Sequence, residues 1–203
     1  MTSKRGYITL YLSTVAVGIL CVEGFNALVD PSALWSPVKG GIERTRVLDA
    51  GGRLFTSARL ARGDWQSVIL GSSRCLRGID PRSPYFVGLR TFDACLSGTN
   101  MAEMAPIAEF ALAHNPQLKR VLIGLDFEMF TARRTMSSDY DASMLSGKST
   151  TEVTLEYLLS WQTLRRSFST LADYFSGRRT DVSDDGSVDM TIDRKSTRLN
   201  SSH

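Results

Sequence analysis

The longest apolar stretch of this 203-residue chain lies near its N-terminus, and it predicts a membrane-spanning helix. Lys4 and Arg5 precede a charge-free run over residues 6–22, and after one glutamate the apolar character returns. At about 1.5 Å per residue, a helix over residues 6–29 is long enough to cross the ~30 Å hydrocarbon layer of a bilayer. Basic residues before such a helix favour the cytoplasmic side, so the chain after Asp30 is expected outside.

Three other interpretations of this segment stay open. A cleaved signal peptide usually has a shorter apolar stretch that ends at a small-x-small site, and no such site follows cleanly here. A lipoprotein cysteine at Cys21 is disfavoured because Leu20, directly before it, is larger than the small residue expected there. A buried helix of a globular domain is the third, because Tyr7, Thr9 and Ser13 weaken the hydropathy.

The central part of the chain alternates short apolar runs with a helical stretch, which predicts an α/β fold. The runs of strand character are residues 67–70 (SVIL), 91–96 (TFDACL) and 121–125 (VLIGL). Between the last two, residues 101–114 predict a helix that is kinked or restarted at Pro106 and ended by Asn115-Pro116. Strand, helix, strand at this spacing implies a right-handed parallel crossover. The continuous run VLIGL is typical of a strand that is covered on both faces.

Less regular segments flank this central part. The prolines and glycines of residues 30–64 are typical of a connector between the anchor and a domain. Residues 131–148 are polar and long for a loop, which favours a lid or disorder. After them, Ser149 and Glu152 form a capping-box pattern that opens a helix. We expect this helix to pack its leucines and phenylalanines on the sheet and to end at Gly177.

The last ten residues differ from the rest. They have no apolar periodicity, and the string Lys-Ser-Thr-Arg-Leu-Asn-Ser-Ser-His resembles a translated sequencing-adapter sequence. We therefore expect this tail to lie outside the fold and the natural protein to continue beyond residue 193; a natural flexible terminus is the alternative. The expected organisation is a cytoplasmic stub and transmembrane anchor over residues 1–29, a connector over 30–64, an incomplete α/β domain over 65–193 and an artefactual tail over 194–203.

Composition and charge exclude several classes of function. The chain is 42% apolar and 22% charged, which suits a buried core. Its formal charge of +3 comes from the tail, because removing three of the 24 basic residues leaves 21, equal to the 21 acids. A nucleic-acid partner is therefore disfavoured. The cysteines match no zinc spacing, and we expect no metal and no cofactor. Cys75 and Cys95 are either small buried residues or, outside the cytoplasm, a disulfide.

Candidate functional residues occupy the turns after the three predicted strands. In a parallel α/β sheet these turns lie together at the carboxyl edge. They read Gly-Ser-Ser-Arg at 71–74, Ser-Gly-Thr-Asn at 97–100 and Asp-Phe-Glu at 126–128. Gly71 permits a tight exit from the strand, so Ser73 is expected at a helix N-terminus, where free N–H groups favour a developing oxyanion. A serine nucleophile needs such a placement.

These turns resemble the motifs of the SGNH (GDSL-like) hydrolase superfamily. The resemblance is closer to its membrane-anchored envelope members, which are related to the D-alanyl-lipoteichoic acid biosynthesis protein and the alginate O-acetyltransferases. It covers roughly residues 64–130 and the N-terminal anchor. It implies a three-layer sandwich with a parallel sheet, SGNH- or flavodoxin-like, preceded by one transmembrane helix. It also implies that Ser73 is the nucleophile and that the Gly98 N–H donates to the oxyanion.

Two features depart from the family pattern. Asp126 stands where the family has asparagine, and an ionised carboxylate cannot donate a hydrogen bond, so Asn100 is the candidate for that donor. The family's C-terminal Asp-x-x-His base has no counterpart here. The chain has only His114, at the predicted end of a helix, and His203, in the tail. The resemblance therefore implies an incomplete domain whose catalytic acid and base lie beyond residue 193.

Together these expectations describe a single-pass protein of the bacterial inner membrane whose domain faces the periplasm or the outside. The domain would act as an esterase or O-acyltransferase on a cell-envelope polymer, and Arg74 would bind an anionic substrate group. The alternatives for these residues are a helix cap for Ser72 and Ser73 and an ion pair of Arg74 with Asp80 or Asp126. The alternative function is a non-catalytic envelope protein that binds a glycan or a membrane partner through the same crevice. The expected partners are the inner membrane and an envelope glycopolymer, with no nucleic acid.

Overall fold

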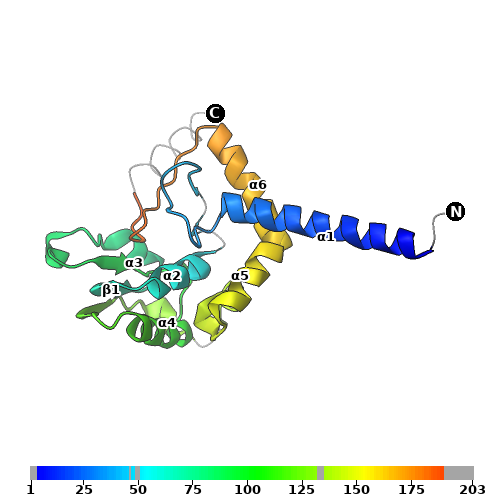
Figure 1. Ribbon diagram of the computed structural model, residues 1–203. Helices are drawn as coiled ribbons and strands as arrows, with labels where there is room; N and C mark the ends of the chain where they lie inside the picture. Colours follow the sequence, from blue (N-terminus) through cyan, green and yellow to red (C-terminus); the bar gives the residue numbers. More distant parts are fainter. Residues whose placement is uncertain (1–3, 46, 49–50, 132–134, 190–203) are drawn as a thin grey trace.

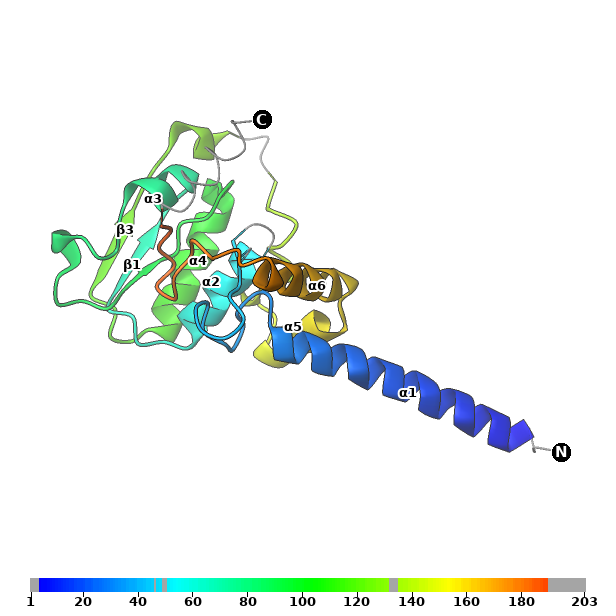
Figure 2. The same cartoon turned by 90° about the horizontal axis from the view of Figure 1, so that it is seen from above.

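The computed structural model of the protein describes residues 4–45, 47–48, 51–131 and 135–189. A small parallel sheet with surrounding helices forms one side of the molecule, and a long helix projects from the other side (Figures 1 and 2). The helices are α1 (Lys4–Val29), α2 (Gly52–Ala61), α3 (Ser73–Gly78), α4 (Met101–His114), α5 (Thr150–Leu159) and α6 (Trp161–Phe175). The strands are β1 (Ser67–Leu70), β2 (Thr91–Asp93) and β3 (Arg120–Ile123). Short 3-10 helices lie at Pro84–Phe86, Phe127–Phe130 and Met144–Ser146.

The sheet has the strand order β2-β1-β3, and both pairings are parallel. In its register, Val68 lies opposite Phe92 on one side and Val121 on the other. The predicted α/β class is thereby confirmed, and β1 matches its predicted run at both ends. α4 also begins and ends where predicted, but it runs through Pro106 as one continuous helix.

Side chains of β1 are buried on both faces of the sheet, because successive residues of a strand point in opposite directions. Val68 packs in one core cluster with Phe55 of α2 and Ile107 of α4. Ile69 packs in another cluster with Leu76 of α3. α2 and α4 therefore cover one face of β1, and α3 covers the other.

β3 is not covered on both faces, contrary to expectation. It lies at the edge of the sheet, where Val121 and Ile123 are 39% and 51% exposed. Among the described residues, no strand pairs with its outer edge. The apolar run predicted the strand correctly and its surroundings wrongly, because hydrophobicity does not say which part of the chain will cover a side chain.

Residues 30–64 lead from α1 to the sheet, as a connector would, but they are also part of the core. α2 contributes Phe55 and Leu60, both 0% exposed, and Val38 before it is equally buried. All three belong to the cluster that packs on β1. The prolines and glycines of this segment correctly indicated an irregular path, but they did not indicate which of its side chains would be buried.

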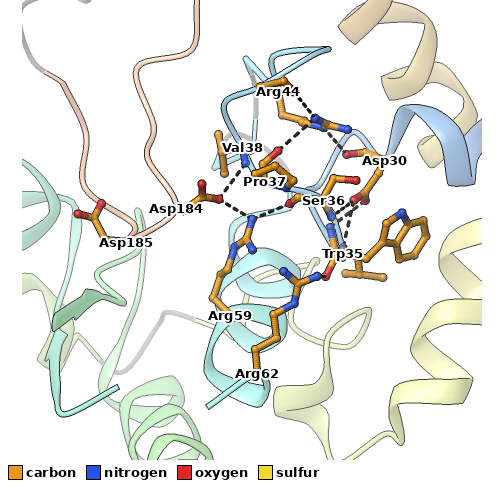
Figure 3. A network of polar contacts seen from close by, with 12 residues as sticks. Asp30, Trp35, Ser36, Pro37, Val38, Arg44, Arg59, Arg62, Asp184 and Asp185 are labelled. Carbon is orange, nitrogen blue, oxygen red and sulfur yellow. Dashed lines mark hydrogen bonds and ion pairs between the residues drawn. The ribbon is translucent and has the colours of Figure 1, made fainter. Parts of the chain in front are cut away.

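Two segments without apolar periodicity also pack on the domain. The Tyr140 hydroxyl donates to the Leu145 carbonyl at 2.8 Å, and both side chains are buried, so the described part of 131–148 is folded. Near the C-terminus, the Asp184 carboxylate lies 2.8 Å from the Arg59 guanidinium of α2. This ion pair attaches the acidic segment around residue 184 to the core (Figure 3).

A polar network fixes the junction between α1 and the domain (Figure 3). The buried Asp30 carboxylate accepts hydrogen bonds from the backbone N–H groups of residues 34–36 and from the Tyr157 hydroxyl. The Arg44 guanidinium donates to the carbonyls of Asp30 and of Val29, the last residue of α1. A cation at a helix C-terminus also complements the helix dipole. The end of α1 is therefore held by the domain rather than attached through a loose linker.

The helix predicted over residues 149–177 is two helices. The capping box is present, because Ser149 and Glu152 each accept a hydrogen bond from the other's backbone N–H. Ser160 then ends α5 and caps α6 by accepting from the Gln162 N–H. The α5–α6 hairpin, residues 150–175, packs against the C-terminal end of α1 and not on the sheet (Figure 1). The expected packing of this helix on the sheet is therefore wrong.

Among the described residues, α1 is the one helix that is long and apolar enough to cross a membrane, over Gly6–Val29. The predicted N-terminal apolar helix is thereby confirmed. The most apolar part of this segment is not buried in the protein, and side chains such as Tyr7 and Leu20 are 70% and 64% exposed. A buried helix of a globular domain, one of the alternatives for this segment, does not fit this exposure.

Candidate serine pocket at the carboxyl edge of the sheet

The three turns singled out in the sequence meet at the carboxyl edge of the sheet. They surround a small pocket of about 120 Å³. Its lining includes Ser72, Ser73 and Arg74 from the first turn, Gly98 from the second, and Asp126 and Glu128 from the third. Parallel strands cause this meeting, because all of them end at the same edge.

The first turn is packed against a disulfide. Cys75 of α3 and Cys95, just after β2, are bonded, with Cα atoms 5.8 Å apart. Of the two alternatives for these cysteines, the structure has the disulfide. A Cβ atom on Gly71 would lie 2.5 Å from the Cys75 Cβ, so this turn accepts only glycine. The disulfide thus links α3, which follows the first turn, to the segment that leads into the second turn.

The two serines of the first turn have different surroundings. Ser72 caps α3 by accepting from the Arg74 N–H at 3.2 Å, and its hydroxyl donates to the Asp126 carboxylate. Ser73 is the first residue of α3 and is partly exposed. Among the described residues, its hydroxyl forms no hydrogen bond. The capping role expected as an alternative therefore belongs to Ser72, and the Ser73 hydroxyl is available at the pocket.

Arg74 pairs with carboxylates of the third turn. Its guanidinium lies 3.3 Å from Asp126 and 3.6 Å from Glu128, and its side chain is 67% exposed. Of the two partners considered for an ion pair, the structure has Asp126. Exposed ion pairs contribute about 0–1 kcal/mol, so Arg74 can turn toward an anionic ligand at little cost.

Gly98 lines the pocket, and Asn100 does not. Gly98 has φ 76°, a left-handed conformation that favours glycine. Asn100 is 2% exposed and caps α4 by accepting from the Glu103 N–H at 3.1 Å. Its amide nitrogen donates to the Thr135 carbonyl, also at 3.1 Å. The Asn100 side chain is therefore engaged in the fold, and its capping role was readable from an asparagine just before the helix.

The part of the chain that the structure describes places no imidazole at the pocket. His114 is the last residue of α4, which starts near the carboxyl edge of the sheet and runs back along it. Its ring stacks on Phe110 at 4.0 Å, and Nδ1 lies 2.9 Å from the Phe110 carbonyl oxygen. His203 lies outside the described residues. His114 therefore occupies the helix end that the sequence analysis expected for it.

A buried carboxyl lies beside the disulfide, and sequence reasoning missed it. Asp93, the last residue of β2, is 2% exposed, and its Oδ1 accepts from the Cys95 N–H at 2.9 Å. Its Oδ2 has no hydrogen-bond partner among the described residues. Burial raises the pKa of Asp93 to about 8, and the nearby Asp185 and Asp80 act in the same direction. Asp93 lies close to the two sulfurs, but metal binding would need them as thiolates rather than as a disulfide.

A larger cavity, of about 470 Å³, lies between α2, residues 137–142 and the α5–α6 hairpin. Many of its lining groups are hydroxyls, and two are guanidiniums. Arg53 is neutralised by the buried Glu103 at 2.6 Å and by Asp139 at 3.2 Å. Arg166 forms neither an ion pair nor a hydrogen bond within the described chain, and burial lowers its pKa. A half-buried cation of this kind is suited to an anionic ligand.

Comparison of the chain with protein-family models, with curated proteins and with solved structures finds no match. The resemblance to SGNH hydrolases therefore stays a prediction that rests on the residues of the three turns. The structure itself shows the α/β fold, the parallel sheet and the pocket at its carboxyl edge.

Proposed function

We propose that this protein is a membrane-anchored domain of the three-layer SGNH type that transfers or removes an acyl group on a cell-envelope polymer. α1 would cross the bacterial inner membrane once and place the domain in the periplasm. The observation that carries the proposal is the meeting of Ser73 and Gly98, from turns 25 residues apart in the sequence, around one pocket at the carboxyl edge of the sheet.

In the proposed reaction, the Ser73 hydroxyl oxygen attacks the carbonyl carbon of an ester, and its proton passes to a base. The N–H groups of Ser73 and Gly98 donate hydrogen bonds to the oxyanion that forms. When the intermediate collapses, the alcohol leaves with a proton, and water or a second hydroxyl then takes the acyl group from the serine. Arg74, which is exposed beside the pocket, would meet an anionic group of the polymer.

The larger cavity supports a polar polymer as the substrate. Ser97 lines this cavity and its neighbour Gly98 lines the serine pocket, so the second turn contributes to both. A sugar unit held among the hydroxyls of the larger cavity would carry its acyl substituent toward Ser73. Arg166 would bind an acidic substituent of the same unit.

A second candidate function is non-catalytic binding of a glycan or a membrane partner through the same crevice. It is favoured by the absence of an imidazole near Ser73 in the described part of the chain. A serine hydroxyl without an adjacent base is a weak nucleophile. Binding needs only the shape and polarity of the two hollows.

Labelling with a fluorophosphonate probe separates the two functions. For the full-length protein purified in detergent, we expect labelling of the wild type and its loss in Ser73→Ala. Ser72→Ala is the matched control, because it removes the neighbouring hydroxyl and a helix cap worth about 1 kcal/mol but leaves the proposed nucleophile. Equal labelling of wild type and Ser73→Ala would remove Ser73 from this role, and an unlabelled wild type would favour the binding function.

A further inference from the structure

α6 turns its apolar side away from the protein. Large side chains recur along it at intervals of three and four residues, which places them on one face of the helix. We call this surface the hairpin face; it consists of Trp161, Leu164, Phe168, Leu171 and Phe175. Trp161, Phe168 and Phe175 are 69%, 61% and 81% exposed. In a helix on the surface of a soluble protein, such a face normally points into the core.

The opposite side of α6 is polar and buried. Its residues Thr163, Ser167, Thr170 and Asp173 are all less than 9% exposed. The Ser167 hydroxyl donates to the Asn26 side chain of α1 at 2.9 Å, and Asp173 accepts from the Thr45 hydroxyl at 2.6 Å. Hydrogen bonds therefore hold α6 on the protein by its polar side and leave the hairpin face uncovered.

α5 adds to the exposed apolar surface next to α1. Leu155 and Leu159 are 51% and 54% exposed, and Leu159 is followed closely by Trp161 at the start of α6. Both views show the turn between α5 and α6 beside α1, and Figure 1 shows α6 crossing the axis of α1 (Figures 1 and 2). The Phe25 ring of α1 contacts the Phe168 ring of α6, so the apolar surface of the hairpin adjoins that of α1.

The position of the hairpin along α1 agrees with the thickness of a bilayer. Counted from Gly6, about 20 helical residues cross the ~30 Å hydrocarbon layer, which places its far boundary near Phe25. The Phe25 ring lies 4.9 Å from the Phe168 ring of the hairpin face. The next residue, Asn26, is buried and hydrogen-bonded to the hairpin. The hairpin face therefore lies at the level where the hydrocarbon layer ends.

We propose that the α5–α6 hairpin is an interfacial membrane element whose hairpin face rests on the lipid surface around α1. This inference rests on the proposed membrane anchoring by α1 and is independent of the acyl-transfer chemistry. Amphipathic helices of this kind bury their apolar side by about 5–10 Å at the boundary of headgroups and acyl chains. Tryptophan is favoured at that depth. The exposed Arg165 and Arg179 favour anionic headgroups.

Quenching of tryptophan fluorescence by brominated lipids tests the proposal. The full chain is reconstituted in bilayers of phosphatidylcholine and phosphatidylglycerol whose acyl chains carry bromine near the headgroup. Trp161 and Trp35 lie near the expected boundary, and Trp65 lies in the sheet domain. We expect Trp161→Phe to lose roughly half of the quenching, because it removes one of the two tryptophans at the depth of the interface. Trp65→Phe, the matched control, should retain the quenching of the wild type.

Extraction with alkaline carbonate separates failure of this inference from failure of the anchor. Quenching that is unchanged in Trp161→Phe, in a protein that resists extraction, would overturn the interfacial role and leave α1 as an anchor. Release of the wild type by carbonate would contradict both. Absence of quenching together with a cross-linked dimer would assign the hairpin face to a second copy of the chain and overturn the lipid assignment.

Discussion

The sheet half and the helix half of the molecule bury opposite kinds of side chains. Around β1, apolar residues such as Val68 and Phe55 are inside and fully buried. Where α1, α5 and α6 meet, polar side chains such as Asn26 and Ser167 bond to each other inside, and Phe168 points outward. The same helical periodicity of apolar residues therefore occurs both where the apolar face is buried in the protein and where it is exposed. It predicts that a helix has an apolar face and leaves open whether protein or lipid covers that face.

The largest expected effect on the free energy of unfolding comes from a buried carboxyl group in the sheet half, which we compare with one in the helix half. Asp30 accepts four hydrogen bonds at the end of α1, whereas Asp93 in the sheet half accepts one from Cys95. The pKa of Asp93 rises from 3.8 to about 8 on folding, so the folded protein keeps this proton at pH values where the unfolded chain has lost it. This contribution to the free energy of unfolding is complete below about pH 4 and falls by roughly 5 kcal/mol as the pH rises to about 8.

Chemical denaturation at a series of pH values measures this loss. Asp93→Asn can still accept the hydrogen bond from Cys95 and cannot ionise. We expect its free energy of unfolding to vary much less than that of the wild type between pH 4 and 8. An equal pH dependence in the two proteins would assign the effect to other groups.

The same substitution, phenylalanine to alanine, at one position in each half of the molecule tests the comparison of the two halves directly. Phe55 is 0% exposed and Phe168 is 61% exposed. Phe55→Ala should lower the free energy of unfolding by about 3–5 kcal/mol, because it leaves a cavity in the core. Phe168→Ala should cost about 1 kcal/mol, from the lost contact with Phe25. Denaturation in detergent measures both, and a cost of several kcal/mol for Phe168→Ala would mean that protein covers this ring.

The smallest expected effect on the free energy of unfolding comes from the residue that caps the start of α4. Asn100→Ala removes a helix cap and should cost about 1 kcal/mol, whereas Asn100→Ser keeps a capping oxygen and should cost less. Thermal denaturation ranks the two variants. If Asn100→Ser keeps the stability of the wild type and loses most of its fluorophosphonate labelling, Asn100 has a role at the serine pocket beyond capping.

Local patterns in the sequence predicted the strands, α4 and the meeting of the three turns. The run at residues 67–70 and the helix at 101–114 match the structure at both ends, because apolar periodicity and turn residues act over a few positions. The separate roles of Ser72 and Ser73 depended on where Asp126 lies, 54 residues away from Ser72. No local pattern contains that information.

The remaining differences are also non-local. Asn26 and Ser167, whose hydrogen bond turns the polar side of α6 inward, are 141 residues apart. The cavity with Arg166 is built from α2, the 137–142 segment and the hairpin, none of which contains the site alone. The burial of Val38, Phe55 and Leu60 likewise depends on contacts with the sheet that composition does not record.

The junction at Asp30 and Arg44 determines how the protein searches for its substrate in the proposed setting. Because hydrogen bonds hold the end of α1 to the domain, a membrane-anchored domain would rotate and diffuse in the plane of the bilayer together with its anchor. In that setting the serine pocket would stay at one height above the lipid and would sample a two-dimensional layer. Its encounters are set by how often a polymer segment enters that layer, and by lateral diffusion within it.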